Sequence, residues 1–209
     1  MRLYLSSFRL GNETEKFKEL VGKENARVAV IDNSRDCYSD DERRTKGLES
    51  EFEDLRSLGF APEYVDLRDY FNDNNALFVK MQSFDVVWVL GGNSFILLKA
   101  MKQSGFDRVV DELIKTNKLV YSGYSAALCV ISPTLDGVEL VDDKDAKAEG
   151  YNDEIIWDGY GLIDFYPIVH YKSDHPESEL VDKELEYVKS KNRKYKTLRD
   201  GENIIVNTK

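Results

Sequence analysis

The stretch that decides the fold is Lys118–Ile131, KLVYSGYSAALCVI. Its first half is rich in the β-branched and aromatic residues of a strand, and its second half fits a helix. Between them, Gly123, Ser125, Ala126 and Ala127 are all small. A strand would ordinarily carry bulk there, so the segment predicts a sharp turn at which a helix returns close to the strand before it.

Upstream of this stretch, strand and helix patterns alternate. Strands are expected at residues 2–7, 26–34, 63–67, 84–90 and 118–123, and helices at 13–22, 40–60, 93–103 and 106–117. The run 84–90 is almost continuously apolar, as in strands that helices cover on both sides. The alternation predicts an α/β fold with a mostly parallel sheet and helices on both faces.

The alternation of strand and helix patterns stops after Pro133. Residues 134–161 are acidic and irregular, and they are followed by an expected strand at 162–171 and an expected helix at 177–192. The segment 195–207 predicts a C-terminal hairpin with its turn at Asp200 and Gly201. Neither a repeat nor a linker interrupts the pattern, so residues 1–209 are expected to form a single domain.

Composition narrows the class of function. The formal net charge of −10 disfavours nucleic acid and anionic membranes as partners. Apolar runs are too short for a membrane span, and the first residues lack the pattern of a signal peptide. Two cysteines do not make a disulfide framework, so a reducing cytoplasm is the expected location.

The turn at residues 123–127 has a catalytic interpretation. Gly-Tyr-Ser-Ala-Ala is close to the nucleophile-elbow pattern, in which a strained turn presents a serine at the carboxyl end of a sheet. The amide of Ala126 would then face a developing oxyanion. The alternative is an ordinary strand-to-helix turn in which Ser125 only caps the helix.

A second turn, Gly91-Gly92-Asn93, directly follows the buried strand at 84–90. Paired glycines let the backbone approach a ligand and aim its amides at it. We expect Gly92 to complete the oxyanion hole and Gly91 and Asn93 to bind substrate. The alternative is a plain glycine turn in which Asn93 caps the next helix; neither the dinucleotide nor the P-loop pattern is present.

A nucleophilic serine needs a base, and the chain has only two histidines. His170 ends an apolar run and should emerge at the carboxyl end of a strand, beside Ser125. His175 lies in a polar loop and is expected to be remote and exposed. The alternative for His170 is a half-buried histidine with a backbone partner.

These segments together resemble the peptidase E group of aspartyl dipeptidases, serine peptidases on a fold similar to class I glutamine amidotransferases. The resemblance runs from Phe84 to Ile131, through the Gly-Gly-Asn-Ser-Phe and Gly-Tyr-Ser-Ala turns, and returns at residues 159–171, GYGLIDFYPIVHY. The family usually has glycine at the positions of Leu90 and Ala127 and proline at that of Val169.

The resemblance implies a Ser-His-acid peptidase acting on short peptides with an N-terminal aspartate. Ser125 and His170 match two members, and the acid should lie between them in the chain. Asp136 is the nearest match, with Glu154, Asp158 and Asp164 as alternatives.

Arg35, Lys172, Arg193 and Arg199 are candidates for binding the substrate carboxylate. No metal or organic cofactor is implied, and the protein would be a monomer or homodimer. The competing hypothesis is a protein on the same fold that binds a small molecule or partner without catalysis.

Overall fold

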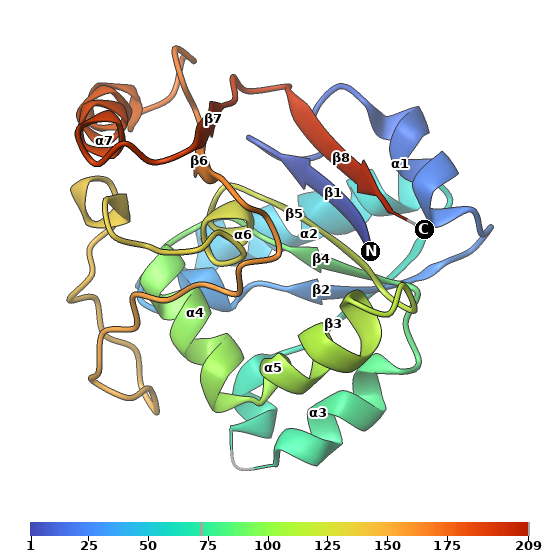
Figure 1. Ribbon diagram of the computed structural model, residues 1–209. Coiled ribbons are helices and arrows are strands. Elements are labelled where there is room, and N and C mark those ends of the chain that lie inside the picture. Colours follow the sequence, from blue (N-terminus) through green and yellow to red (C-terminus); the bar gives the residue numbers. More distant parts are fainter. Residues whose placement is uncertain (72, 209) are drawn as a thin grey trace.

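The computed structural model of the chain describes residues 1–71 and 73–208, and it is built around a six-stranded sheet of order β3-β2-β4-β5-β1-β8 (Figure 1). The strands are β1 (Arg2–Ser6), β2 (Arg27–Ile31), β3 (Ala61–Tyr64), β4 (Val86–Val89), β5 (Val120–Tyr124) and β8 (Asn203–Asn207). The first five run parallel, and β8 runs antiparallel to β1. The predicted mostly parallel sheet is confirmed.

Helices cover both faces of the sheet. One face packs against α1 (Thr14–Val21) and α2 (Asp41–Ser57), and the other against α3 (Asn74–Met81), α4 (Ser94–Gln103) and α5 (Phe106–Val109), which continues as a π-helical turn, Val110–Ile114. Strand β2 shows why both faces are covered. Val28 and Val30 lie in the hydrophobic core on the side of α1 and α2, whereas Ala29 and Ile31 lie in the core on the side of α3, α4 and α5. Alternating side chains thus reach opposite faces, and both sets are apolar.

A smaller unit lies beyond the carboxyl ends of the main strands (Figure 1). It contains the one-turn helix α6 (Ala126–Cys129), the strand β6 (Tyr166–Ile168), the helix α7 (Ser178–Ser190) and the strand β7 (Tyr195–Thr197). Strands β6 and β7 pair in parallel as a separate two-stranded sheet.

The predicted C-terminal hairpin is wrong. Strand β7 pairs with β6, and β8 pairs with β1, so the two strands belong to different sheets. Gly201 does provide a turn, with φ of 94°. An alternating pattern on both sides of a glycine turn fits a hairpin and a crossing between sheets equally well, because both need extended strands and a positive φ.

Two other elements differ from the sequence expectation. Helix α3 had no counterpart in the pattern, and the strand expected at residues 162–171 shrinks to the three residues of β6. The chain then turns at His170, which has φ of 55°. No described helix is long and apolar enough to cross a membrane.

Candidate active site

Ser125 stands between β5 and α6 in a conformation that few residues other than glycine adopt, with φ of 52° and ψ of −110°. A Cβ atom on Gly123 would lie 2.2 Å from the carbonyl oxygen of Val89 and 2.7 Å from Cβ of Ala127. The small residues therefore have a packing reason: helix α6 returns directly against β5, and the methyl group of Ala127 fits only because residue 123 has none. The turn leaves Ser125 partly exposed.

The structure brings His170 to this serine. Its Nε2 atom lies 3.2 Å from Oγ of Ser125, within hydrogen-bond reach. The backbone N–H of His170 donates to Oγ of Ser7 at 2.8 Å, which holds the turn after β6 against the end of β1. The residue is only 2% exposed, and this burial lowers the pKa of the imidazole.

Asp200 lies on the opposite side of the same ring. Its Oδ1 atom is 2.7 Å from Nδ1 of His170. Because a carboxylate accepts hydrogen bonds, this contact places a proton on Nδ1 and leaves Nε2 free to accept one from Ser125. Asp200 also opposes the lowering of the histidine pKa that burial causes. The backbone N–H of Asp200 donates to Oγ of Ser173 at 2.8 Å, which fixes the loop.

Asp136, the acid expected from chain order, is elsewhere. Its carboxylate pairs with Arg193 and accepts a hydrogen bond of 2.7 Å from the hydroxyl of Tyr187. The carboxylate that meets His170 comes instead from the crossing between β7 and β8, downstream of the histidine. Of the alternatives, Asp164 is a surface acid paired with Lys194, and the other two, Glu154 and Asp158, are exposed.

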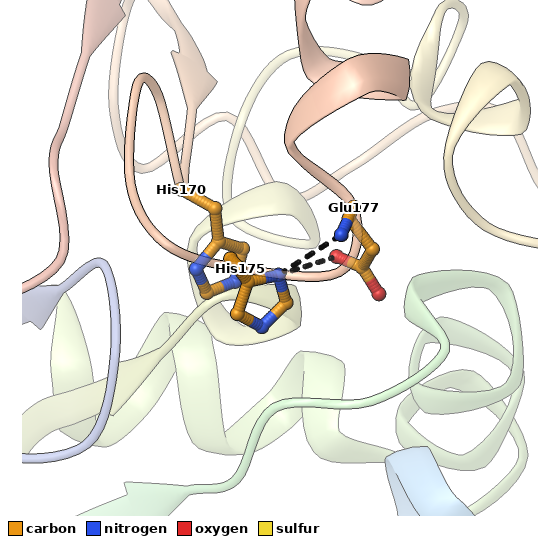
Figure 2. A group of neighbouring side chains, drawn as sticks. All are labelled: His170, His175 and Glu177. Atoms are coloured by element: carbon orange, nitrogen blue, oxygen red, sulfur yellow. Dashed lines mark hydrogen bonds and ion pairs between the residues drawn. The ribbon is translucent and has the colours of Figure 1, made fainter.

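The expectation that His175 is remote and exposed is also wrong. Its ring stacks on that of His170, with centroids 3.7 Å apart and planes inclined by 6° (Figure 2). Its Nδ1 atom lies 3.8 Å from Oε2 of Glu177. Phe8 presents its ring edge-on to both imidazoles, at 6.1 Å and 6.0 Å between centroids, while 42% of it stays exposed. The polar loop therefore folds over the site.

The turn after β4 faces Ser125 through its glycines. A Cβ atom on Gly91 would lie 3.0 Å from Cβ of Ser125, so this position needs the absence of a side chain. Gly92 is partly exposed. The amide of Ala126 is the first in α6 and has no partner within its helix. Both amides therefore remain candidates for an oxyanion hole.

Asn93 does not present its side chain to a substrate. Its Oδ1 atom accepts from the N–H of Ile96 at 2.9 Å, and its Nδ2 atom donates to the carbonyl of Asp143 at 2.7 Å. It is also 3% exposed. Asn93 is the N-cap of α4, and the substrate-binding role expected for it is replaced by this structural one.

Sequence reasoning missed Ser7. Its buried hydroxyl accepts from the His170 N–H and donates to Oδ1 of Asp200 at 2.9 Å, so it touches two members of the site. The available signal was its position: Ser7 follows β1, the sheet neighbour of β5, and carboxyl ends of parallel strands meet at one edge.

The four side chains considered as binders of a substrate carboxylate differ in their contacts and exposure. Arg35 donates to the carbonyl of Gly91 at 3.0 Å and to the hydroxyl of Tyr124 at 2.9 Å, and it pairs with the buried carboxylate of Asp32 at 3.4 Å, while its side chain stays 22% exposed. Arg193 is taken by Asp136. Lys172 and Arg199 are exposed neighbours of His170 and Asp200 along the chain.

A serine on a strand-to-helix turn, an imidazole at its hydroxyl and a carboxylate at the other ring nitrogen are the arrangement of serine hydrolases on α/β folds. The chain belongs to peptidase family S51, whose family model matches residues 6–209. This is a family of serine peptidases with a fold similar to class I glutamine amidotransferases, so the expected family is confirmed.

Two of the curated relatives that the chain matches are described as uncharacterized peptidases. An uncharacterized peptidase of Listeria monocytogenes is 30% identical over 129 residues, 62% of this chain, and one of Pasteurella multocida is 30% identical over 92 residues, 44% of this chain. These alignments span 59% and 42% of the relatives' own lengths.

Two solved structures share the fold. A Listeria monocytogenes EGD-e protein, provisionally named peptidase E, superposes with a TM-score of 0.74 at 25% identity, over 100% of this chain and 98% of its own. A peptidase from an acI-B1 actinobacterium gives 0.56 at 16% identity, over 88% of this chain and 74% of its own, and supports the fold alone.

Proposed function

We propose that this chain is a serine peptidase that hydrolyses short peptides beginning with aspartate. The observation that carries the proposal is the continuous contact from Ser125 through His170 to Asp200, at 3.2 Å and 2.7 Å. Each atom has the role that acyl transfer requires: a hydroxyl that can attack, a ring nitrogen that can take its proton, and a carboxylate that fixes the tautomer.

The reaction would proceed through an acyl-enzyme. Oγ of Ser125 attacks the peptide carbonyl while Nε2 of His170 accepts its proton, and the imidazolium then protonates the leaving amine. Asp200 stabilises the positive charge on the ring. The amides of Gly92 and Ala126 would hold the oxyanion at the site where negative charge develops. Water then attacks the ester carbonyl while Nε2 of His170 accepts its proton, and the ring returns this proton to Oγ of Ser125 as the ester bond breaks and the acid product leaves.

Specificity for aspartate requires a cation near the scissile bond, and we assign this role to Arg35. Its hydrogen bonds to Gly91 and Tyr124 and its ion pair with Asp32 hold the guanidinium beside the glycine turn that faces Ser125. An arginine can meet a carboxylate with two parallel hydrogen bonds. Replacing Arg35 by Met should therefore raise KM for Asp-initiated dipeptides much more than for Ala-initiated ones, whereas Lys172→Met should not.

The decisive experiment is a panel of dipeptides with N-terminal Asp, Glu or Ala, assayed with the wild type, Ser125→Ala and His170→Ala. Each single variant should lose most of the rate, and the double variant should lose little more, because members of such a triad act as a unit. Equal turnover by wild type and Ser125→Ala would exclude Ser125 as the nucleophile. A pure wild type that turns over none of the panel would favour the alternative, a non-catalytic binding protein.

A further inference from the structure

His170, His175 and Glu177 form a cluster, here the His-His-Glu cluster, between β6 and α7 (Figure 2). One ligand atom from each residue lies within 4.8 Å of the other two. The proposed hydrolysis uses only His170, and it leaves the stacking of His175 and the position of Glu177 without a role. Two imidazoles and a carboxylate are also a common set of zinc ligands.

The distances suit an ion with short bonds. Bonds of about 2.0–2.1 Å in tetrahedral geometry set ligand atoms about 3.4 Å apart. Nδ1 of His175 and Oε2 of Glu177 are already 3.8 Å apart. The spacing His175-Pro176-Glu177 puts these two ligands on one short turn, near enough to each other to reach the same ion.

Asp200 prepares His170 for an ion as well as for catalysis. It occupies Nδ1 at 2.7 Å, which leaves the Nε2 lone pair as the one available to a metal. A carboxylate behind a metal-binding histidine commonly fixes the tautomer and the ring orientation in this way. The same lone pair is the one that faces Ser125. Metal and serine therefore compete for a single atom.

The stacked arrangement itself is not the bound one. An imidazole binds metal in the plane of its ring, and the planes of His170 and His175 are inclined by only 6°. The two parallel lone pairs cannot meet at one ion, so one ring must turn. His175 is the ring that can turn: its side chain lies on a loop, is 19% exposed and is held at one nitrogen, where Nδ1 accepts a hydrogen bond of 3.4 Å from the N–H of Glu177, whereas the His170 ring is held at both nitrogens.

We propose that the His-His-Glu cluster binds Zn²⁺ or a similar divalent transition metal through Nε2 of His170, His175 and Glu177, and that the bound ion inhibits hydrolysis by taking Nε2 from Ser125. The inhibition rests on the proposed peptidase function, but the binding does not. The ion is an inhibitor here, with no part in the chemical steps.

Binding is tested on the Ser125→Ala protein in a Cys37→Ser background, which removes both turnover and the more accessible thiol. Zn²⁺ titrated calorimetrically should bind with one-to-one stoichiometry. His175→Ala and Glu177→Gln should each weaken binding by about tenfold or more, since loss of even an outer partner of a metal ligand costs ten- to hundredfold. Glu179→Gln, which removes an exposed acid two positions away, should leave the affinity unchanged.

The chain has only two histidines, so the ligand nitrogens can be observed directly. In a long-range ¹H–¹⁵N spectrum, Zn²⁺ should shift Nε2 of His170 and one nitrogen of His175, and both shifts should reverse with EDTA. Unperturbed imidazoles, or equal affinity in the His175→Ala variant, would overturn the proposal. If binding follows this pattern but no dipeptide is hydrolysed, the metal site stands and the proposed function fails.

With active protein, Zn²⁺ should inhibit dipeptide hydrolysis, and EDTA should restore it. The concentration for half inhibition should rise about tenfold or more in Glu177→Gln, in proportion to the lost affinity, and stay unchanged in Glu179→Gln. Inhibition that is equally strong in Glu177→Gln would refute the assigned ligand set.

Discussion

Ser7 and Asp200 are 193 positions apart, and the hydroxyl of Ser7 donates to Oδ1 of Asp200 at 2.9 Å. The same hydroxyl accepts from the backbone of His170, so one buried side chain sets the distance between the acid and the base. The carboxylate is thus placed by the residue that follows β1, a strand of the main sheet, although it belongs to a loop between two sheets. This relationship supports two predictions about the proposed triad.

The first prediction compares two acids. Asp200→Asn should lower kcat by about 10³–10⁴-fold, because an amide can hold His170 in the wrong tautomer while leaving the geometry intact. Asp136→Asn should keep wild-type kinetics, since Asp136 contacts Arg193 and Tyr187 instead. The measurement is kcat and KM on an Asp-initiated dipeptide. The reverse order of effects would restore Asp136 as the orienting acid.

The second prediction concerns Ser7 as a positioning residue. Ser7→Ala should lower kcat by about tenfold with little change in KM, because only the alignment of His170 and Asp200 is disturbed. It should also cost about 1–3 kcal/mol of stability, since the His170 N–H loses its buried acceptor. Ser104→Ala is the matched control: Ser104 is equally buried and donates to Met101 in helix α4. A similar fall in kcat in both variants would mean that Ser7 acts only through stability.

The third prediction tests why the serine turn is built from small residues. Gly123→Ala should destabilise the fold by about 3 kcal/mol or more, because the new methyl would meet the rigid carbonyl of Val89 at 2.2 Å and would require a φ of 151°. Gly59→Ala also has a positive φ but nothing within 4 Å, so it should cost only about 1 kcal/mol. The measurement is the free energy of unfolding of both variants in urea. Equal losses would show that backbone conformation matters and crowding does not.

The fourth prediction concerns pH and stability. Glu184 is 4% exposed, and burial raises the pKa of its carboxyl to about 8. Below the unfolded pKa of 4.5 the group is neutral in both states and costs nothing. As pH rises toward 8, the unfolded state ionises first, so the folded state loses stability by up to about 1.4 kcal/mol per pH unit.

Glu184→Gln should remove that loss, because the amide oxygen can still accept the hydrogen bond that Tyr166 donates at 2.8 Å. We therefore expect the free energies of unfolding of the wild type and the variant, measured at pH 5, 6.5 and 8, to be most similar at pH 5. At pH 8 the variant should be the more stable protein. Parallel curves for the two proteins would contradict the raised pKa. Asp142, whose pKa burial raises to about 6, is present in both proteins, and its charge contributes to the raised pKa of Glu184.

The main sheet could be predicted from sequence because its signals are local. Strands such as β4 are continuous apolar runs, and the turn at Gly123 carries its packing constraint in its own residues. The partners of β7 and β8 could not be predicted. An extended segment specifies that it needs a neighbour, but the neighbour is set by where the preceding helix, α7, delivers the chain.

The residues of the candidate active site also fall into those that could be predicted from the sequence and those that could not. Ser125 and His170 could be recognised because each sits at the end of an apolar strand pattern. Asp200 could not, because its role depends on contacts between segments far apart in the chain, and one more acid in so acidic a sequence gives no signal. Ser7 had only the signal of its position after β1. His175 was misjudged because polar loop residues are usually solvated, whereas here the loop folds back onto His170.

The crossing from β7 to β8 has a consequence for biosynthesis. Ser125 and His170 leave the ribosome before Asp200 does, and the Asp200 loop lies between β7 and β8, which pair with β6 and β1 in two different sheets. A growing chain therefore holds its serine and histidine without the carboxylate that orients them. Under the proposed mechanism, Ser125 therefore gains a fully oriented base only after the segment that carries Asp200 has been made.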